Sequence, residues 1–95
     1  MTEARPARAA FAAEKAWRLN PQVALRDETF GALAYHYGNR RLVFLKSRLL
    51  VDLVSSLGDY ASATDAIATL VPERLRGRYE RALARLAASE VIDAR

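Results

Sequence analysis

The side chains of this 95-residue chain do not form a recognisable catalytic centre in the sequence. His36 is the one histidine, and cysteine is absent. A lone imidazole without thiolates and without an acid at ligand spacing is a poor metal site, so we expect no metal and no other cofactor. Ser55 and Ser56 have no nearby histidine to act as a base. The sequence therefore predicts a protein that binds rather than an enzyme.

Arginine and lysine supply the chemistry that the sequence does offer, which is the binding of acidic groups. The chain has 15 basic and 11 acidic residues and a net charge of +4. Residues 1–46 carry 8 basic and 4 acidic residues, so this half holds the whole excess. Arg40, Arg41, Lys46 and Arg48 form a local run with no acid among them. Such a patch favours an acidic partner, either a peptide or a nucleic acid, although the same charges also suit a solvated strand edge.

A second set of cations recurs at helical spacing near the C-terminus. At 100° per residue, Arg78, Arg81 and Arg85 fall within an arc of about 60° on one helix. This basic stripe borders the face that we expect to point into the core. The stripe suits either a solvated face or the rim of a binding groove. The expected core face comprises Tyr79, Ala82, Leu83 and Leu86.

The length fits one domain, and the N-terminal residues do not look like part of its core. Residues 1–16 are rich in Ala, Arg and Glu, with Phe11 as the large apolar group, so we expect a poorly ordered arm ahead of a single domain over 17–95. The start is too polar for a secretion signal. No apolar run approaches the roughly 18 residues of a membrane span. We therefore expect a cytoplasmic protein without membrane contact.

The residues after Pro21 have the two-residue alternation of β-strands. Val23 and Leu25 mark a short first strand, which a turn at residues 27–29 ends. A second strand is predicted over residues 31–37. Gly38 and Asn39 then tolerate positive φ, which predicts a hairpin.

The predicted third strand, residues 41–46, is apolar on both faces. Leu42 and Phe44 point to one side, and Val43 and Leu45 point to the other. A strand of this kind expects cover on both sides, so we expect these side chains to belong to the core.

The remainder of the chain has the period of α-helices. Helices are predicted over residues 48–57, 63–70 and 77–89. Ser47 and Ser62 are suitable N-caps for the first two. The predicted order is thus three strands followed by three helices, an α+β arrangement.

The segment over residues 17–47 resembles the mycofactocin precursor-peptide chaperones. These are small relatives of the pyrroloquinoline-quinone peptide chaperone, and both are recognition elements for ribosomally made, modified peptides. The resemblance rests on the stretches NPQVALR, FGALAYHYGNRR and FLKS. Residues 48–92 match in helix order and apolar spacing only. The resemblance implies an α+β, winged-helix-like fold with a three-stranded antiparallel sheet followed by three helices.

The resemblance also implies a non-catalytic role: the protein holds the leader of a precursor peptide and presents it to a radical S-adenosylmethionine (SAM) maturase. That enzyme oxidatively decarboxylates the C-terminal Tyr of the peptide and links it to the neighbouring Val. In this family class the leader adds as a strand beside the third strand and lies against the third helix. Without peptide, the free edges would also allow two copies to pair as a homodimer. The implied peptide-binding residues are Arg41, Leu42, Val43, Phe44, Leu45, Lys46, Arg78, Arg81, Ala82 and Arg85.

A winged-helix, DNA-binding transcriptional regulator is the alternative function. A helix–turn–helix over residues 62–89 and a pI near 10.0 suit it. Two features count against it. Only residues 91–95 follow the third helix, too few for a wing hairpin, and the basic stripe lacks the Asn or Gln that reads adenine. We therefore expect no nucleic-acid partner; a small structural subunit is the third alternative.

Overall fold

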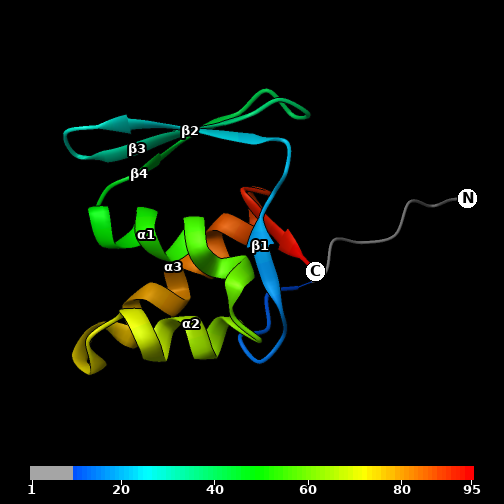
Figure 1. The fold of residues 1–95 in the computed structure, drawn as a ribbon. Helices are drawn as coiled ribbons and strands as arrows, with labels where there is room; N and C mark the ends of the chain where they lie inside the picture. The colour runs from blue at the N-terminus through cyan, green and yellow to red at the C-terminus, as the bar shows by residue number, and fades with distance from the viewer. Residues whose placement is uncertain (1–9) are drawn as a thin grey trace, which may run out of the picture.

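The computed structural model describes residues 10–95, and residues 1–9 lie outside the described part. A three-stranded antiparallel sheet forms one layer, and the helices pack beneath it, with α1 directly below (Figure 1). This arrangement confirms the predicted α+β class with three antiparallel strands followed by three helices. The sheet comprises β2 (Val23–Glu28), β3 (Gly31–His36) and β4 (Leu42–Leu45) in that order, and the helices are α1 (Arg48–Ser56), α2 (Ala63–Leu70) and α3 (Arg76–Ala88).

The central strand β3 shows the predicted alternation between its two faces. Ala32, Ala34 and His36 are buried against the helices, whereas Leu33 and Tyr35 on the other face are partly exposed. Because successive side chains of a strand point to opposite faces, one apolar set on β3 anchors the sheet to the helical layer.

The expectation that β4 is covered on both faces is wrong. Leu45 is fully buried beneath the sheet and Val43 is partly buried, but Leu42 and Phe44 are 61% and 58% exposed. The physical reason is that all three helices lie on one side of the sheet, so the side chains on its other face meet solvent (Figure 1). Leu42 and Phe44 therefore do not belong to the core.

The β2–β3 turn lies later than predicted, at Thr29 and Phe30, because β2 continues to Glu28. Gly31 follows this turn with a φ of 150°. A Cβ atom at Gly31 would collide with the carbonyl oxygen of Leu45 on β4. Glycine is thus required where β3 passes closest to β4.

The β3–β4 turn is organised by His36, which lies in the hairpin as the sequence predicted. Its Nδ1 accepts hydrogen bonds from the backbone N–H groups of Gly38 (2.9 Å) and Asn39 (3.1 Å). The positive φ expected at Gly38 or Asn39 falls instead at Arg40, with a φ of 66°. The buried imidazole therefore supplies an acceptor to a turn whose amides would otherwise be unpaired.

The predicted N-caps are both confirmed. The Ser47 hydroxyl accepts a hydrogen bond from the N–H of Leu50 (3.0 Å), and the Ser62 hydroxyl accepts one from Asp65 (3.1 Å). Short 3-10 helices follow α1 at Leu57–Asp59 and precede α3 at Glu73–Leu75. The fully buried residues of the core come from β3, from β4 and from all three helices or their ends, and they include Ala32, Leu45, Leu53, Leu57, Ala66 and Leu83.

A second, two-stranded sheet joins the two ends of the described chain and was not predicted. It pairs β1 (Trp17–Leu19) with β5 (Ile92–Ala94) in antiparallel register. Buried Asn20 strengthens this closure, since its backbone N–H donates to the carbonyl of Val91 (2.9 Å) and its Nδ2 to that of Glu90 (3.0 Å). The residues after α3 therefore return to the N-terminal strand instead of forming a wing.

Trp17 anchors the preceding segment to the core. It is 3% exposed, its ring lies 5.1 Å from that of Phe11, and its Nε1 donates to the carbonyl of Ala12 (2.8 Å). The carbonyls of Ala13 and Lys15 accept hydrogen bonds from the first amides of α2. Of the arm predicted over residues 1–16, residues 1–9 lie outside the described residues, and the part from residue 10 onward makes these contacts with the domain.

We predict that His36→Ala destabilises the protein by about 1–3 kcal/mol, because two turn amides lose their acceptor. His36→Asn is the matched control, since its amide oxygen can occupy the position of Nδ1 and accept the same bonds. Chemical denaturation followed by circular dichroism measures both variants. Equal midpoints for the two variants would show that the Nδ1 hydrogen bonds contribute nothing.

Candidate functional site

Strand β4 lies at the edge of the sheet and pairs with β3 alone. The strand spans Leu42–Leu45, so Arg41 and Lys46 from the predicted strand flank it at its two ends. Its other edge has no strand partner among residues 10–95. A free strand edge presents backbone donors and acceptors that can pair with a further strand.

The register decides which backbone groups face that free edge. The carbonyl of Arg41 accepts a hydrogen bond from β3 (3.0 Å). Because hydrogen-bonded pairs recur at every second residue of an antiparallel ladder, the backbone groups of Val43 and Leu45 also face β3. The N–H and C=O groups of Leu42 and Phe44 therefore face away from the sheet. No other segment within residues 10–95 hydrogen-bonds to them.

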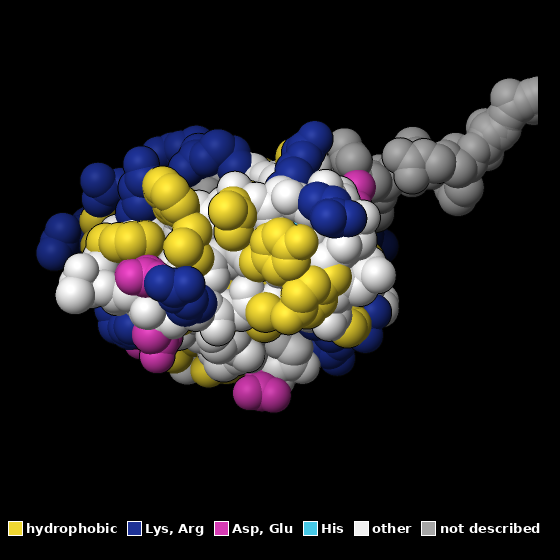
Figure 2. Space-filling view, turned by 90° about the horizontal axis from the view of Figure 1, so that it is seen from above, with side chains coloured by type: hydrophobic (Ala, Val, Ile, Leu, Met, Phe, Trp, Pro, Cys, Tyr) yellow, Lys and Arg dark blue, Asp and Glu magenta, His cyan; other side chains and the backbone are white. Residues whose placement is uncertain are grey.

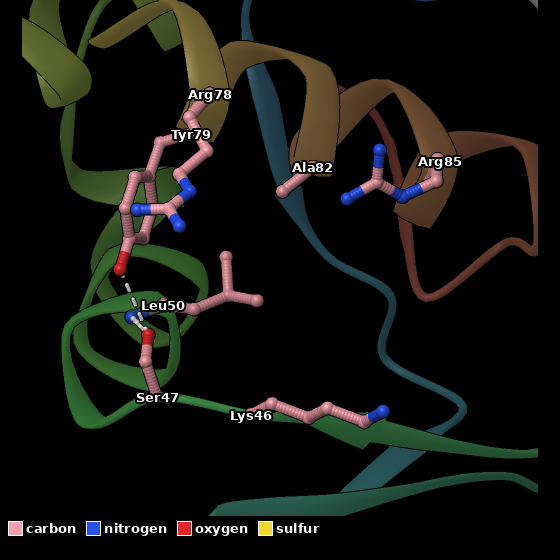
Figure 3. A pocket seen from close by; sticks show the side chains of 7 residues that line it. All are labelled: Lys46, Ser47, Leu50, Arg78, Tyr79, Ala82 and Arg85. Atoms are coloured by element: carbon pink, nitrogen blue, oxygen red, sulfur yellow. Dashed lines mark hydrogen bonds between the residues drawn. The ribbon is translucent and has the colours of Figure 1, made fainter. Parts of the chain in front are cut away.

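A pocket of about 310 Å³ lies between the end of β4 and the side of α3 (Figure 3). Lys46 approaches it from the strand, whereas Arg78 and Arg85 come from α3. Leu50 of α1 lies between the two elements and gives the pocket an apolar wall. The complete lining comprises Lys46, Ser47, Leu50, Arg78, Tyr79, Ala82 and Arg85.

A hydrogen bond between Ser47 and Tyr79 ties the strand end to α3. The Ser47 hydroxyl lies 3.0 Å from the Tyr79 hydroxyl and also caps α1 by accepting from Leu50 (3.0 Å). One serine therefore fixes the start of α1 and holds α3 beside the end of β4. The spacing of these two elements sets the width of the pocket.

The structure brings together some of the cations expected in the site and separates others. Lys46, Arg78 and Arg85 line the pocket together, and no acidic residue lines it. Arg81 is exposed on α3 but lies outside the lining. Arg48, which belonged to the run without acids in sequence, forms an ion pair with Asp27 near the end of β2 (3.5 Å). The positive charge at the pocket therefore comes from one lysine and two arginines.

The remaining predicted site residues fall into two groups. Leu42 and Phe44 combine an outward backbone with an exposed side chain. Leu45 is fully buried and bonds to β3, so it supports the strand from within the core. Among residues 10–95, no cluster of three His, Cys, Asp or Glu side chains is placed to hold a metal ion.

The predicted peptide-binding residues do not include three residues of the pocket: Ser47, Leu50 and Tyr79. Ser47 was predicted as a helix N-cap, and Tyr79 as part of the core face of the third helix. The adjacency of Ser47 to Lys46 was a usable signal, since a cap at the end of an edge strand lies where the strand and the following helix meet. Tyr79 is partly buried, so it serves both the core and the pocket.

Comparison with known proteins places the chain in a family. The family model described as "Peptide chaperone MftB family" matches residues 16–93. Over 83 residues the chain is 43% identical to the peptide chaperone MftB of Mycolicibacterium smegmatis, covering 86% of this chain and 81% of that relative. The identity is 50% over 56 residues with the protein of the same name from Mycobacterium tuberculosis, covering 59% of this chain and 51% of the relative.

A third relative, the peptide chaperone MftB of Mycobacterium ulcerans, is 43% identical over 84 residues, covering 87% of this chain and 77% of the relative. No solved structure matches the chain. The family match extends well beyond residues 17–47 and includes all three helices. It confirms the resemblance to the mycofactocin precursor-peptide chaperones: this chain belongs to the peptide chaperone MftB family.

Proposed function

We propose that this chain is a non-catalytic peptide chaperone of mycofactocin biosynthesis. It binds the leader of a ribosomal precursor peptide by β-strand addition along β4 and presents it to a radical SAM maturase, which performs the chemistry. Membership of a family of peptide chaperones supports this role over DNA binding. The observation that supports this binding mode is that the backbone groups of Leu42 and Phe44 face outward. The cationic pocket beside α3 lies at the end of the same strand.

The backbone edge supplies affinity for almost any extended peptide. Leu42 and Phe44 each offer one N–H and one C=O, and each hydrogen bond to a leader contributes about 0.5–1.5 kcal/mol. These bonds involve only main-chain atoms of the leader, so they position the peptide without selecting its sequence. Selectivity must come from pockets for alternate side chains.

The pocket supplies that selectivity. A leader strand beside β4 turns every second side chain toward the helical layer, where Lys46, Arg78 and Arg85 surround the pocket. An Asp or Glu there meets three cations, while Leu50 and Ala82 contact its methylene groups. The favoured leader is therefore acidic and partly apolar.

The other residues of the proposed site act at its margin or from below. Arg41 and Arg81 add positive charge at the rim, which raises the rate of encounter with an acidic peptide. Val43 and Leu45 hold the strand to β3 and to the core. The full set remains Arg41, Leu42, Val43, Phe44, Leu45, Lys46, Arg78, Arg81, Ala82 and Arg85.

Three features of the proposed setting complete the function. No helix within residues 10–95 has the length and hydropathy needed to cross a bilayer. A cytoplasmic location stays a prediction. Pairing of two copies through their β4 edges is the expected competitor of the leader, because both occupants would use the same backbone groups.

We predict that Phe44→Pro weakens leader binding by at least about threefold relative to Phe44→Ala, because proline removes the outward N–H donor and places its ring at the free edge. Phe44→Ala is the matched control, since it removes the aromatic ring but keeps the donor. Fluorescence anisotropy of a labelled precursor peptide measures both affinities.

Val43→Pro provides the contrasting variant, because its N–H faces β3. Val43→Pro should unfold the sheet and not only weaken leader binding. Proline is tolerated in a strand only where the missing N–H faces outward, and the N–H of Val43 faces β3. Equal leader affinity of folded Phe44→Pro and Phe44→Ala would place the binding edge elsewhere.

We predict that Arg85→Glu weakens leader binding more than Arg81→Glu, although both change the same charge on the same helix. Arg85 lines the pocket and Arg81 does not. The Arg85 variant should lose roughly tenfold in affinity at low salt and less at high salt, because mobile ions screen charges at the surface. Titrations at two salt concentrations test this, and equal losses for both variants would remove the pocket from the mechanism.

A further inference from the structure

The outer face of the sheet is apolar over an area that the leader does not occupy. We use "outer face" for the side of the sheet opposite the helices. Figure 2 looks onto this side and shows apolar side chains gathered across it. Phe30, Tyr37, Leu42 and Phe44 are 43%, 60%, 61% and 58% exposed, respectively.

These side chains are contiguous along and across the strands. The rings of Phe30 and Phe44 lie 5.7 Å apart, and those of Tyr35 and Tyr37 lie 5.1 Å apart. Leu42 faces Tyr35 across the ladder at a position without mutual hydrogen bonds, where opposing side chains come closest. Single exposed apolar residues are ordinary, but a continuous apolar patch marks an interaction surface.

The bound leader would leave this face open. The proposed leader lies against the edge of β4 and the pocket beside α3, which belongs to the helical side of the sheet. The side chains of Leu42 and Phe44 point instead to the outer face. A protein on the outer face could therefore bind at the same time as the peptide and would lie directly beside it.

The charges around the outer face indicate what kind of partner fits. Residues 23–48 carry five basic and two acidic side chains. The two acids, Asp27 and Glu28, already pair with Arg48 (3.5 Å) and Arg26 (2.9 Å). Figure 2 shows Lys and Arg side chains most densely along one side of the apolar area, whereas most of the Asp and Glu side chains in view lie toward the opposite side. The basic residues of this segment without an acidic partner among residues 10–95 are Arg40, Arg41 and Lys46, and Lys46 lines the pocket on the helical side.

A second copy docked through its own outer face does not complement this surface, because like charges would meet. Residues 1–9 carry two arginines and one glutamate, so their charge does not complement it either. Charge complementarity across interfaces favours a partner whose apolar centre is ringed by acidic side chains.

We propose that the outer face docks the maturase, through an apolar surface of that enzyme ringed by Asp and Glu. The inference rests on the proposed function and adds the surface by which the chaperone delivers the peptide. Strand β4 then serves both partners at once: its backbone holds the leader, and its outward side chains contact the enzyme that receives it.

The test is a double variant, Phe30→Ser with Tyr37→Ser, which alters the outer face without replacing any residue of β4 or of the pocket lining. Tyr60→Ser, after α1 and its 3-10 turn, is the aromatic control outside the sheet, at a side chain that is partly buried against the core. Two affinities are measured for each full-length protein: one for a labelled precursor peptide, and one for the purified maturase on a sensor surface. We expect the double variant to lose roughly tenfold or more for the maturase, while its leader affinity and both affinities of Tyr60→Ser change by less than about twofold.

The maturase affinity of Arg40→Glu is a second test, and it does not depend on the folding of the double variant. It should weaken the maturase complex severalfold at low salt, because it opposes the acidic ring. Unchanged maturase affinity in both outer-face variants would overturn the proposal. A wild-type dimer in sedimentation that the double variant dissociates would also overturn it, in favour of self-association.

The affinity for the precursor peptide tests the proposed function, and the affinity for the maturase tests the outer face, so the two proposals can fail separately. Failure of the unaltered chain to bind the precursor peptide would refute the proposed function, whereas the maturase affinities would still decide whether the outer face docks that enzyme.

Discussion

Strand β4 has a hydrogen-bonded neighbour on one side only, and the possible uses of this molecule follow from that constraint. A backbone amide or carbonyl without a partner is tolerated where water reaches it, so an edge strand is stable but remains ready to pair. In β4 the register leaves these groups on Leu42 and Phe44. The chain passes directly from β4 into α1, so no further strand of the same segment closes the edge.

The junction at Ser47 converts this edge into a site with a defined shape. Its hydroxyl caps α1 through Leu50 and bonds to Tyr79 of α3. The end of the edge strand and the basic side of α3 are therefore held at one spacing before any ligand arrives. A preformed pocket of this kind avoids part of the ordering cost that binding otherwise carries.

The one-sided packing of the sheet gives the same strand two surfaces of different character. Leu45 is buried toward the helices, and Phe44 is exposed on the opposite side. The helical side contains the cationic pocket, whereas the outer face is aromatic and aliphatic. The two-stranded sheet of β1 and β5 closes the other end of the domain, away from both surfaces (Figure 1).

The sequence by itself determined the local structure. The alternation in residues 31–37 specified β3, and the serines at positions 47 and 62 specified where two helices begin, because both signals depend on neighbours within a few residues. Periodicity also placed the arginines of α3 on one stripe. The stretches that resemble a known family predicted the family to which the chain belongs.

Only the tertiary structure decided which surfaces are open and which side chains meet. The apolar pattern of Leu42 to Leu45 is the same for a strand covered on both faces and for one covered on a single face. Because the helices pack on one side of the sheet only, Leu45 is buried and Leu42 and Phe44 are exposed. Residues far apart in the chain come together in two places: Trp17 pairs with Ala94, and Lys46 lines the same pocket as Arg85. Such contacts depend on the global arrangement of layers, which local hydrogen bonding and periodicity do not encode.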